Sequence, residues 1–167
     1  MEFLLNNVFG GIVAPILVLI LLYIWKVLYD RVDLSGEWDV TIKVRESAYR
    51  PYLKLSAEFK FHLLKEGDKI SGTGEKISNS NHEGADTIYP HAKRPTVRIE
   101  GVYRKNIFSK NSLVLSIVEN GSLRESRTTY HLIQQSRKVF DGNFESTAAD
   151  SRGDATLKVS RTYFKKL

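Results

Sequence analysis

The chain of 167 residues contains no cysteine and has only one methionine, four prolines and two tryptophans. Without thiols it can form neither a disulfide nor a thiolate metal site, which agrees with a reducing compartment. It also lacks a Gly-rich phosphate loop ahead of a helix, a nucleophile elbow and a His-Glu-x-x-His motif. These absences remove the common catalytic frameworks. We therefore expect a protein that is not an enzyme and carries no cofactor.

Charge is absent from one long segment, residues 3–25. At a helical rise of about 1.5 Å per residue, this segment spans roughly the 30 Å hydrocarbon core of a bilayer. Tyr23 and Tyr29 would lie at headgroup level, where aromatic side chains are enriched. The sequence therefore predicts one transmembrane helix at residues 8–29, within an N-terminal anchor of residues 1–31.

Two features of this segment leave its packing open. Gly10, Gly11 and Pro15 lie in its first half. In membranes, small residues let helices approach closely, and proline is tolerated when neighbours satisfy the freed carbonyl. These residues indicate either a kink or a face for self-association. A cleaved signal peptide is the main alternative to an anchor, but the segment lacks a basic n-region and a small-residue cleavage site.

The charge of the remaining chain is one-sided. The formal net charge is +6, and because Glu2 and Lys26 cancel, all of the excess lies beyond the predicted helix. Loops rich in Lys and Arg stay on the cytoplasmic side of a membrane, so we expect a single-pass protein with a cytoplasmic C-terminal domain. A basic domain suits anionic lipid and phosphate-bearing ligands equally, and charge alone does not choose between them.

Beyond residue 32 the sequence alternates apolar and polar side chains with a period of two, which is typical of half-buried β-strands. Trp38, Val40 and Ile42 begin the pattern. Turn signals separate its repeats, and Asn120-Gly121 is the strongest hairpin signal among them. Eight strands are predicted, at residues 38–44, 53–63, 69–77, 96–104, 112–119, 123–133, 138–147 and 154–163.

Eight strands joined mostly as hairpins predict an all-β domain over residues 32–167, an eight-stranded up-and-down, lipocalin-like β-barrel. A sandwich of the same strands is the alternative. Such a barrel is just wide enough for its own side chains or for one small ligand. Gly72 and Gly74 in the third strand permit tight coiling or leave room inside. We expect the barrel to be hollow.

The segment at residues 78–95 is rich in Ser, Asn, Gly and Pro and has no sustained period, which predicts a long loop. His82, Glu83, Asp86 and His91 lie in it. Their spacing matches no standard metal site, so a solvated loop is the better interpretation and we predict no metal.

Polar side chains on the inner faces of strands are the candidates for a ligand site. The last strand places Arg161 and Tyr163 on the same side as Leu157. The sixth strand faces its polar residues inward if Leu132 is inward, whereas Ile133 favours the opposite face. Aromatic faces stack on bases, and Arg binds phosphate oxygens. The predicted ligand-binding residues are Tyr103, Arg124, Thr128, Tyr130, Arg161 and Tyr163.

Each of these residues also has a structural interpretation, because tyrosines at a barrel end often cap the core and arginines there often reach solvent. A second group could close over the same mouth of the barrel. It consists of the loop residues Tyr89, His91, Lys93 and Arg94.

The order of these parts resembles a known family. A short N-terminal membrane segment and a brief linker precede Leu34-Ser35-Gly36-Glu37-Trp38, which opens the run of strands. Gly67-Asp68-Lys69-Ile70-Ser71-Gly72 forms the first hairpin return. In this architecture the chain resembles the transmembrane β-barrel effectors of bacterial antiphage signalling (CBASS). The better-known pattern has two transmembrane helices, whereas residues 3–25 supply one.

The resemblance implies that a nucleotidyltransferase makes a cyclic oligonucleotide during phage infection and that the barrel binds it. The effector then oligomerises in the bacterial inner membrane and disrupts it, which halts growth before phage are released. In a related arrangement the nucleotide instead keeps the effector silent. The implied partners are a cyclic di- or trinucleotide, the lipid bilayer and further copies of the chain through the transmembrane helix, but no DNA or RNA polymer.

Two other functions remain open. One is a lipid- or small-metabolite-binding barrel that its anchor keeps close to membrane-derived ligand, which predicts a mainly apolar lumen. The other is an interaction module whose barrel is filled entirely by its own side chains and whose helix pairs with a partner. The interior of the barrel distinguishes both from a nucleotide sensor.

Overall fold

The computed structural model describes residues 2–29, 32–80, 86–106, 108–120 and 125–160. The chain divides into two compact units, residues 1–33 and 34–167. The predicted boundary between residues 31 and 32 lies close to this division.

The N-terminal unit contains the helix α1 (Glu2–Tyr29), which includes Pro15. It covers the whole of the predicted helical span and begins before it. Within α1, burial is described at residues 11 and 13–25. Among the described residues of the chain, no helix is both long enough and apolar enough to cross a membrane.

The second unit is built almost entirely from strands. They are β1 (Gly36–Glu46), β2 (Ser56–Glu66), β3 (Lys69–Ser80), β4 (Asp86–Ile88), β5 (Thr96–Arg104), β6 (Ser112–Asn120), β7 (Glu125–Ser136), β8 (Val139–Ser146) and β9 (Ser151–Val159). Three short 3-10 turns accompany them: η1 (Arg50–Tyr52), η2 (His91–Lys93) and η3 (Ala148–Asp150).

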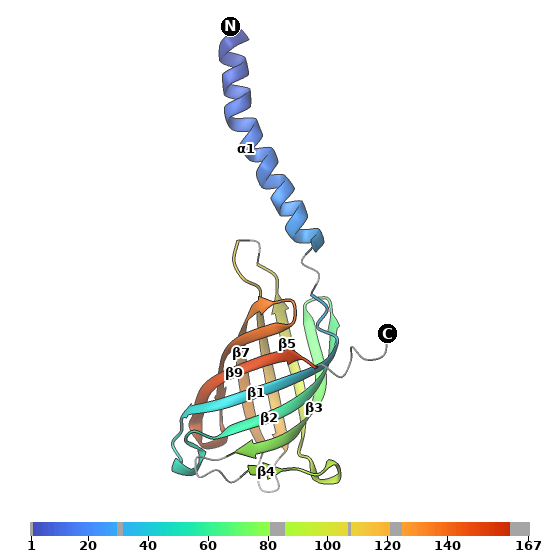
Figure 1. Ribbon diagram of the computed structural model, residues 1–167, viewed down its shortest axis with the longest axis vertical. Helices are drawn as coiled ribbons and strands as arrows, with labels where there is room; N and C mark the ends of the chain where they lie inside the picture. Colours follow the sequence, from blue (N-terminus) through green and yellow to red (C-terminus); the bar gives the residue numbers. More distant parts are fainter. Residues whose placement is uncertain (1, 30–31, 81–85, 107, 121–124, 161–167) are drawn as a thin grey trace. The chain divides into compact units, whose positions relative to one another are not determined.

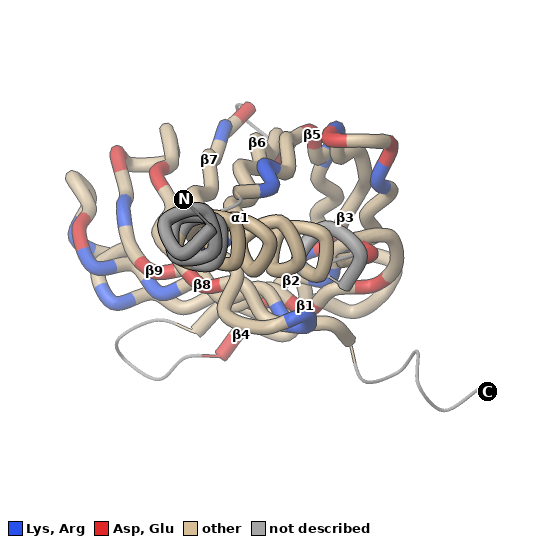
Figure 2. The backbone as a smooth tube through the Cα atoms, turned by 90° about the horizontal axis from the view of Figure 1, so that it is seen from above, with Lys and Arg blue, Asp and Glu red and all other residues tan. Residues whose placement is uncertain are grey.

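These strands form one closed antiparallel barrel (Figure 1). The eight strands other than β4 form the ring. Each pairs with the next along the chain, β3 pairing with β5, and the pairing of β9 with β1 closes it. The eight-stranded up-and-down barrel is therefore confirmed and a sandwich is excluded. Seen from above, Lys and Arg are interspersed with Asp and Glu around the wall (Figure 2).

The predicted long loop at residues 78–95 is partly wrong. The strand β3 continues to Ser80, and the short strand β4 adds to it beyond the point where its pairing with β5 ends. The turn η2 then leads to β5. A three-residue strand is too short to show a period, which is why the sequence pattern missed it. Residues 81–85 lie outside the described residues, as do the Asn-Gly turn at Gly121 and two of the loop's metal-ligand candidates, His82 and Glu83.

The interior of the barrel is filled by its own side chains, which corrects the expectation of a hollow barrel. Trp38 and Phe140 meet edge to face with ring centroids 5.9 Å apart, and Phe140 meets Tyr103 at 6.4 Å. Tyr130 packs between Phe61 and Phe144, at 6.4 and 6.0 Å. The largest side chains that are less than 2% exposed are Trp38, Tyr130, Phe61, Phe140 and Phe144. A ligand held in the middle of the barrel would have to displace these rings.

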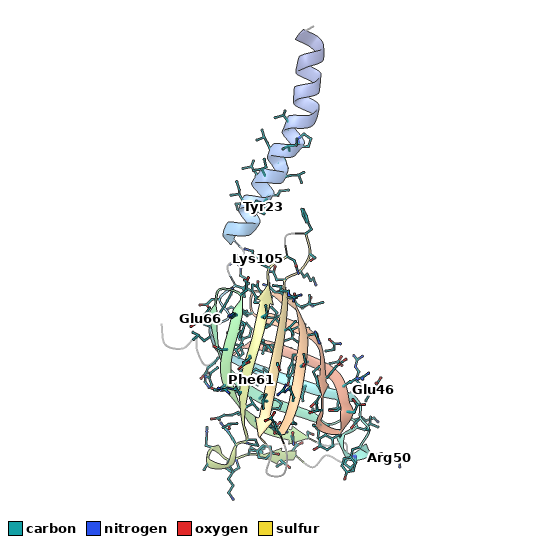
Figure 3. All side chains as sticks on the ribbon, turned by 180° about the vertical axis from the view of Figure 1, so that it is seen from behind. Tyr23, Glu46, Arg50, Phe61, Glu66 and Lys105 are labelled. Atoms are coloured by element: carbon teal, nitrogen blue, oxygen red, sulfur yellow. The ribbon has the colours of Figure 1, made fainter. Side chains whose placement is uncertain are left out.

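A glycine on β3 shows how the filling is achieved. Gly74 pairs with Phe61 on β2. A Cβ atom at Gly74 would lie 2.5 Å from Cδ1 of Phe61 and 3.0 Å from Cγ2 of Val97, which is too close for either contact. The missing side chain therefore makes room for the Phe61 ring, which lies within the barrel (Figure 3).

This complementarity predicts a coupled pair of substitutions. Gly74→Ala should lower the free energy of unfolding by about 1–3 kcal/mol through overpacking. Phe61→Leu in the same chain should recover part of that loss, so the two changes together should cost less than the sum of the single changes. Thermal and denaturant unfolding of the four variants followed by circular dichroism measures this. The outward-facing Thr73→Ala on the same strand is the control, and strictly additive effects would contradict the packing argument.

Candidate functional site

The two ends of the barrel differ in chemistry. The turns β2–β3, β5–β6 and β7–β8 lie at one end, and the connections β1–β2, β3–β5, β6–β7 and β8–β9 lie at the other. We call the first the basic end, because its turns carry Lys65, Lys69, Arg104, Lys105, Lys110, Arg137 and Lys138. In Figure 3, Lys105 and Glu66 mark the basic end, whereas Glu46 and Arg50 mark the opposite end.

A satisfied hydrogen-bond network lies beneath the basic end. The buried Asn111 donates from Nδ2 to Oε1 of Gln134 at 2.7 Å, and the Tyr103 hydroxyl approaches the same oxygen at 3.4 Å. Trp38 donates from Nε1 to the carbonyl oxygen of Leu34 at 2.9 Å. Because these buried polar groups have partners within the chain, they hold the structure together at this end.

The opposite end carries an inward-facing ion pair. Lys76 pairs with Phe59 across β2 and β3, and Glu119 pairs with Val97 across β5 and β6, so both charges stand on the inner face. The ammonium of Lys76 lies 3.9 Å from Oε1 of Glu119 and 5.5 Å from the centre of the Phe59 ring. The side chains are only 16% and 27% exposed. Because the side chains are partly buried, the electrostatic interaction of either charge with a third charged group would be stronger than in bulk water.

A β-bulge follows Lys76 on β3. The register of β2 and β3 shifts between Glu58 and Phe59, so that Ile77 on β3 has no single partner. The backbone N–H of Lys76 donates to the carbonyl oxygen of Pro95 at 3.0 Å, which fixes the strand where it leaves β5. Bulges commonly redirect side chains at barrel rims, and this one lies directly beside the charged residue.

Hydroxyl groups lie on the same inner face, where Thr128 opposes Ile117, the inward residue that precedes Glu119 on β6. Thr128 Oγ1 on β7 and Ser146 Oγ on β8 are 2.8 Å apart and hydrogen-bonded. We call Lys76, Glu119, Thr128 and Ser146 together the polar cluster. It contains a cation, a carboxylate and two hydroxyls, and the ring of Phe59 lies beneath the Lys76 ammonium.

Tyr130 lies beneath the polar cluster, two residues along β7 from Thr128. Burial raises the pKa of its hydroxyl well above the ordinary value of 10, and the nearby carboxylate of Glu119 raises it further. The hydroxyl therefore stays neutral at physiological pH and serves the site only as a neutral hydrogen-bonding group.

A further polar pair flanks this end. Asn79 pairs with Ala57, on the inner face, and donates from Nδ2 to the Tyr89 hydroxyl at 3.3 Å. Its buried Oδ1 has no hydrogen-bond partner among the residues that the structure describes. Arg94 instead bonds Glu75 on the outer face, at 3.1 Å. Of the loop residues predicted to close over the mouth, Tyr89 thus lies beside an inward residue and Arg94 does not.

The structure brings only part of the predicted ligand set together. Thr128 and Tyr130 are inward neighbours, and the burial of Leu132 against the exposure of Ile133 resolves the ambiguous parity of that strand. Tyr103 is buried toward the basic end, at the far side of the filled interior from Thr128. The remaining three, Arg124, Arg161 and Tyr163, lie outside the described residues.

The prediction missed Lys76, Glu119 and Ser146. The signal was present in the alternation itself, since Lys76 continues the inward series Ile70, Gly72 and Gly74, and Glu119 continues the series that begins at Leu113. A charged residue at an inward position of an otherwise apolar series is the feature that could have identified the site.

Two hollows lie on the outer wall of the barrel. One of about 680 Å³ is lined by Lys69, Val102, Arg104 and Val114 among others. A second of about 450 Å³ is lined by residues that include Asp39, Lys60, His91 and Arg94. In the described residues, no three His, Asp or Glu side chains gather as metal ligands would.

Comparison with known proteins supports the fold and nothing finer. No family model matches the chain, and no curated protein matches it. The solved structures that resemble it include a redesigned β-barrel, b11L5F_LGL, at 12% identity and a TM-score of 0.54, with 76% of this chain and 91% of that chain covered. Another is the redesigned barrel mFAP0 bound to DFHBI, at 13% identity and a TM-score of 0.50, with 75% and 97% covered.

The buried hydroxyl of Tyr130 predicts a pH dependence of stability. Below about pH 10 the hydroxyl is neutral in both the folded and the unfolded chain, so it adds no pH dependence to the free energy of unfolding. Above that pH the unfolded chain loses a proton that the folded chain retains, so the free energy of unfolding should fall, by about 1.4 kcal/mol per pH unit.

Tyr130→Phe removes this contribution while the other tyrosines remain. The free energy of unfolding of the wild type minus that of Tyr130→Phe should therefore stay constant below about pH 10 and decrease above it. Denaturant unfolding at a series of pH values measures both curves. Curves that remain parallel through the alkaline range would show that the hydroxyl titrates normally.

Proposed function

We propose that the protein is a non-enzymatic, membrane-anchored antiphage effector of the CBASS kind, whose barrel binds a cyclic di- or trinucleotide at the polar cluster. The observation that carries the proposal is the inward-facing ion pair of Lys76 and Glu119, held above the Phe59 ring at one end of a basic barrel. Charges on the inner face of a barrel cost free energy unless they have a task or a partner. Here the Lys76 ammonium and Oε1 of Glu119 lie 3.9 Å apart, which is a long distance for an ion pair.

The chemistry of the polar cluster matches the parts of a cyclic nucleotide. The Lys76 ammonium suits a phosphodiester oxygen, and the Glu119 carboxylate suits an N–H donor on a base edge. The hydroxyls of Thr128 and Ser146 can each donate to phosphate or sugar oxygens. Because aromatic side chains fill the middle of the barrel, the ligand would lie across this end, above Tyr130, rather than deep in the lumen.

The membrane anchor in this proposal is supported by the sequence, in which residues 3–25 carry no charge. The excess of Lys and Arg beyond residue 29 favours a single-pass topology with the barrel in the cytoplasm of a bacterial cell, against the inner membrane. In this arrangement, nucleotide binding at the barrel controls self-association of the helix, which Gly10 and Gly11 would permit, and thereby the integrity of the membrane.

Titration calorimetry of the full-length chain in detergent with a panel of cyclic di- and trinucleotides tests the proposal. At least one should bind, and Lys76→Ala should weaken its binding about tenfold or more, since a charge-assisted hydrogen bond contributes about 1.5–3 kcal/mol. Lys60→Ala is the matched control, because Lys60 neighbours Phe59 in sequence but faces outward, so its loss should act only through screened attraction.

Two further variants separate a binding role from a structural one. Lys76→Arg keeps the charge and should retain much of the affinity, and Glu119→Gln should change the preference among bases more than the affinity for all of them. Uniform absence of binding across the panel, or equal effects of the Lys76 and Lys60 substitutions, would contradict the proposal.

The filled interior favours one second candidate, an interaction module without a small ligand. A barrel occupied by Trp38, Phe61, Phe140 and Phe144 is stable without a guest. In that case none of the nucleotides binds, and the chain instead co-purifies with a protein partner. The same packing argues against the lipid-binding alternative, which needs an apolar lumen with space in it.

A further inference from the structure

A single aromatic side chain stands out at the basic end. Phe108, in the connection between β5 and β6, is 97% exposed. Phenylalanine carries no polar atom that could compensate for contact with water, so a fully exposed ring at a loop tip is an unusual feature. Lys105 and Lys110 flank it on either side.

The loop that carries Phe108 is held at its base by hydrogen bonds. The backbone N–H of Asn106 donates to Oδ1 of Asn111 at 2.9 Å, and Asn106 Nδ2 donates to the carbonyl oxygen of Lys110 at 2.9 Å. Asn111 is itself buried and bonded to Gln134. The exposed ring is thus presented from a fixed base.

Positive charge predominates in the surrounding turns. Across the turns β2–β3, β5–β6 and β7–β8, seven Lys and Arg side chains stand against two acidic ones in the described residues. The basic residues are those that define the basic end, and the acidic ones are Glu66 and Asp68. A surface of this charge is complementary to an anionic one.

Apolar side chains also face outward close to these turns. Leu64, Val102 and Ile133 lie within three residues of the ends of β2, β5 and β7, and they are 52%, 41% and 47% exposed. Val102 and Val114 also line the larger outer hollow, together with the cations Lys69 and Arg104 and the acidic residues Glu66 and Glu100. Apolar side chains beside cations are typical of protein surfaces that rest at the headgroup level of a bilayer.

The chain between α1 and the barrel is short. Only residues 30–35 separate α1 from β1, and β1 begins at the basic end. Six residues span at most about 20 Å when fully extended.

We propose that the basic end docks on the surface of an anionic lipid bilayer, with Phe108 inserted at the headgroup level and Lys105 and Lys110 against lipid phosphates. The contact orients the barrel so that the polar cluster faces away from the membrane. The proposal rests on the membrane anchoring within the proposed function, but not on nucleotide binding.

The absence of cysteine makes the test direct, because a single introduced thiol can be labelled. Phe108→Cys in the full-length chain is labelled with an environment-sensitive nitrobenzoxadiazole dye and inserted into lipid nanodiscs. The discs consist of phosphatidylcholine alone or mixed with phosphatidylglycerol. Tyr49→Cys is the matched control, since Tyr49 is an exposed aromatic residue, 57% accessible, in the β1–β2 connection at the other end.

In discs that contain phosphatidylglycerol, the dye at position 108 should emit at shorter wavelength and be quenched by iodide several-fold more slowly than the dye at position 49. Adding Lys105→Glu and Lys110→Glu should remove this difference. Equal quenching at positions 108 and 49 in the anionic discs would overturn the proposal, as would protection that is unchanged by the charge reversals. The measurement contains no nucleotide, so a failure of nucleotide binding leaves its outcome unaffected.

Discussion

Closure of the barrel by the pairing of β1 with β9 is the constraint from which the other features follow. Trp38 opposes Val159 and Lys43 opposes Asp154 in this pairing, which joins the first strand of the unit to the last. Once the ring is closed, each strand has one inner and one outer face, and side chains alternate between them without exception outside a bulge. The burial of Tyr130 and the inward position of Lys76 are both consequences of that alternation.

The closed ring also explains why the two ends can differ so much. A filled middle separates them, since Phe61, Phe140 and Tyr130 occupy the space that links one mouth to the other. At the basic end, buried polar atoms are satisfied within the chain, as with Asn111 and Gln134. At the opposite end the polar cluster leaves a cation and a carboxylate 3.9 Å apart, at the outer limit of an ion pair. The first arrangement stabilises the fold, whereas the second is the one to which the proposed function assigns ligand binding.

The alternation of apolar and polar residues with a period of two predicted most of the fold. All eight barrel strands were located from it, and β5 matches residues 96–104 to the residue. The pattern shows which face of the sheet a side chain lies on, but it does not show how the volumes of the inward side chains fit together. The expectation of a hollow barrel was therefore wrong, because the fit of Phe61 against Gly74 depends on the register between two strands. The site was predicted only in part for a related reason. Tyr and Arg were predicted from their residue type, whereas Lys76 and Glu119 follow from their inward positions in the alternation.

A filled interior limits how a ligand at the polar cluster could influence the rest of the chain. Tyr130 touches Phe61, Phe61 lies opposite Trp38, and Trp38 touches Phe140, which in turn meets Tyr103 near the basic end. Close-packed rings of this kind do not deform continuously, so a ligand would act by selecting between discrete packings or by ordering the connections around it. A ligand that bound all packings equally would change nothing beyond its own site, however tightly it bound. The proposed effector role therefore requires that the ligand distinguish between states of this aromatic column or of the loops above it.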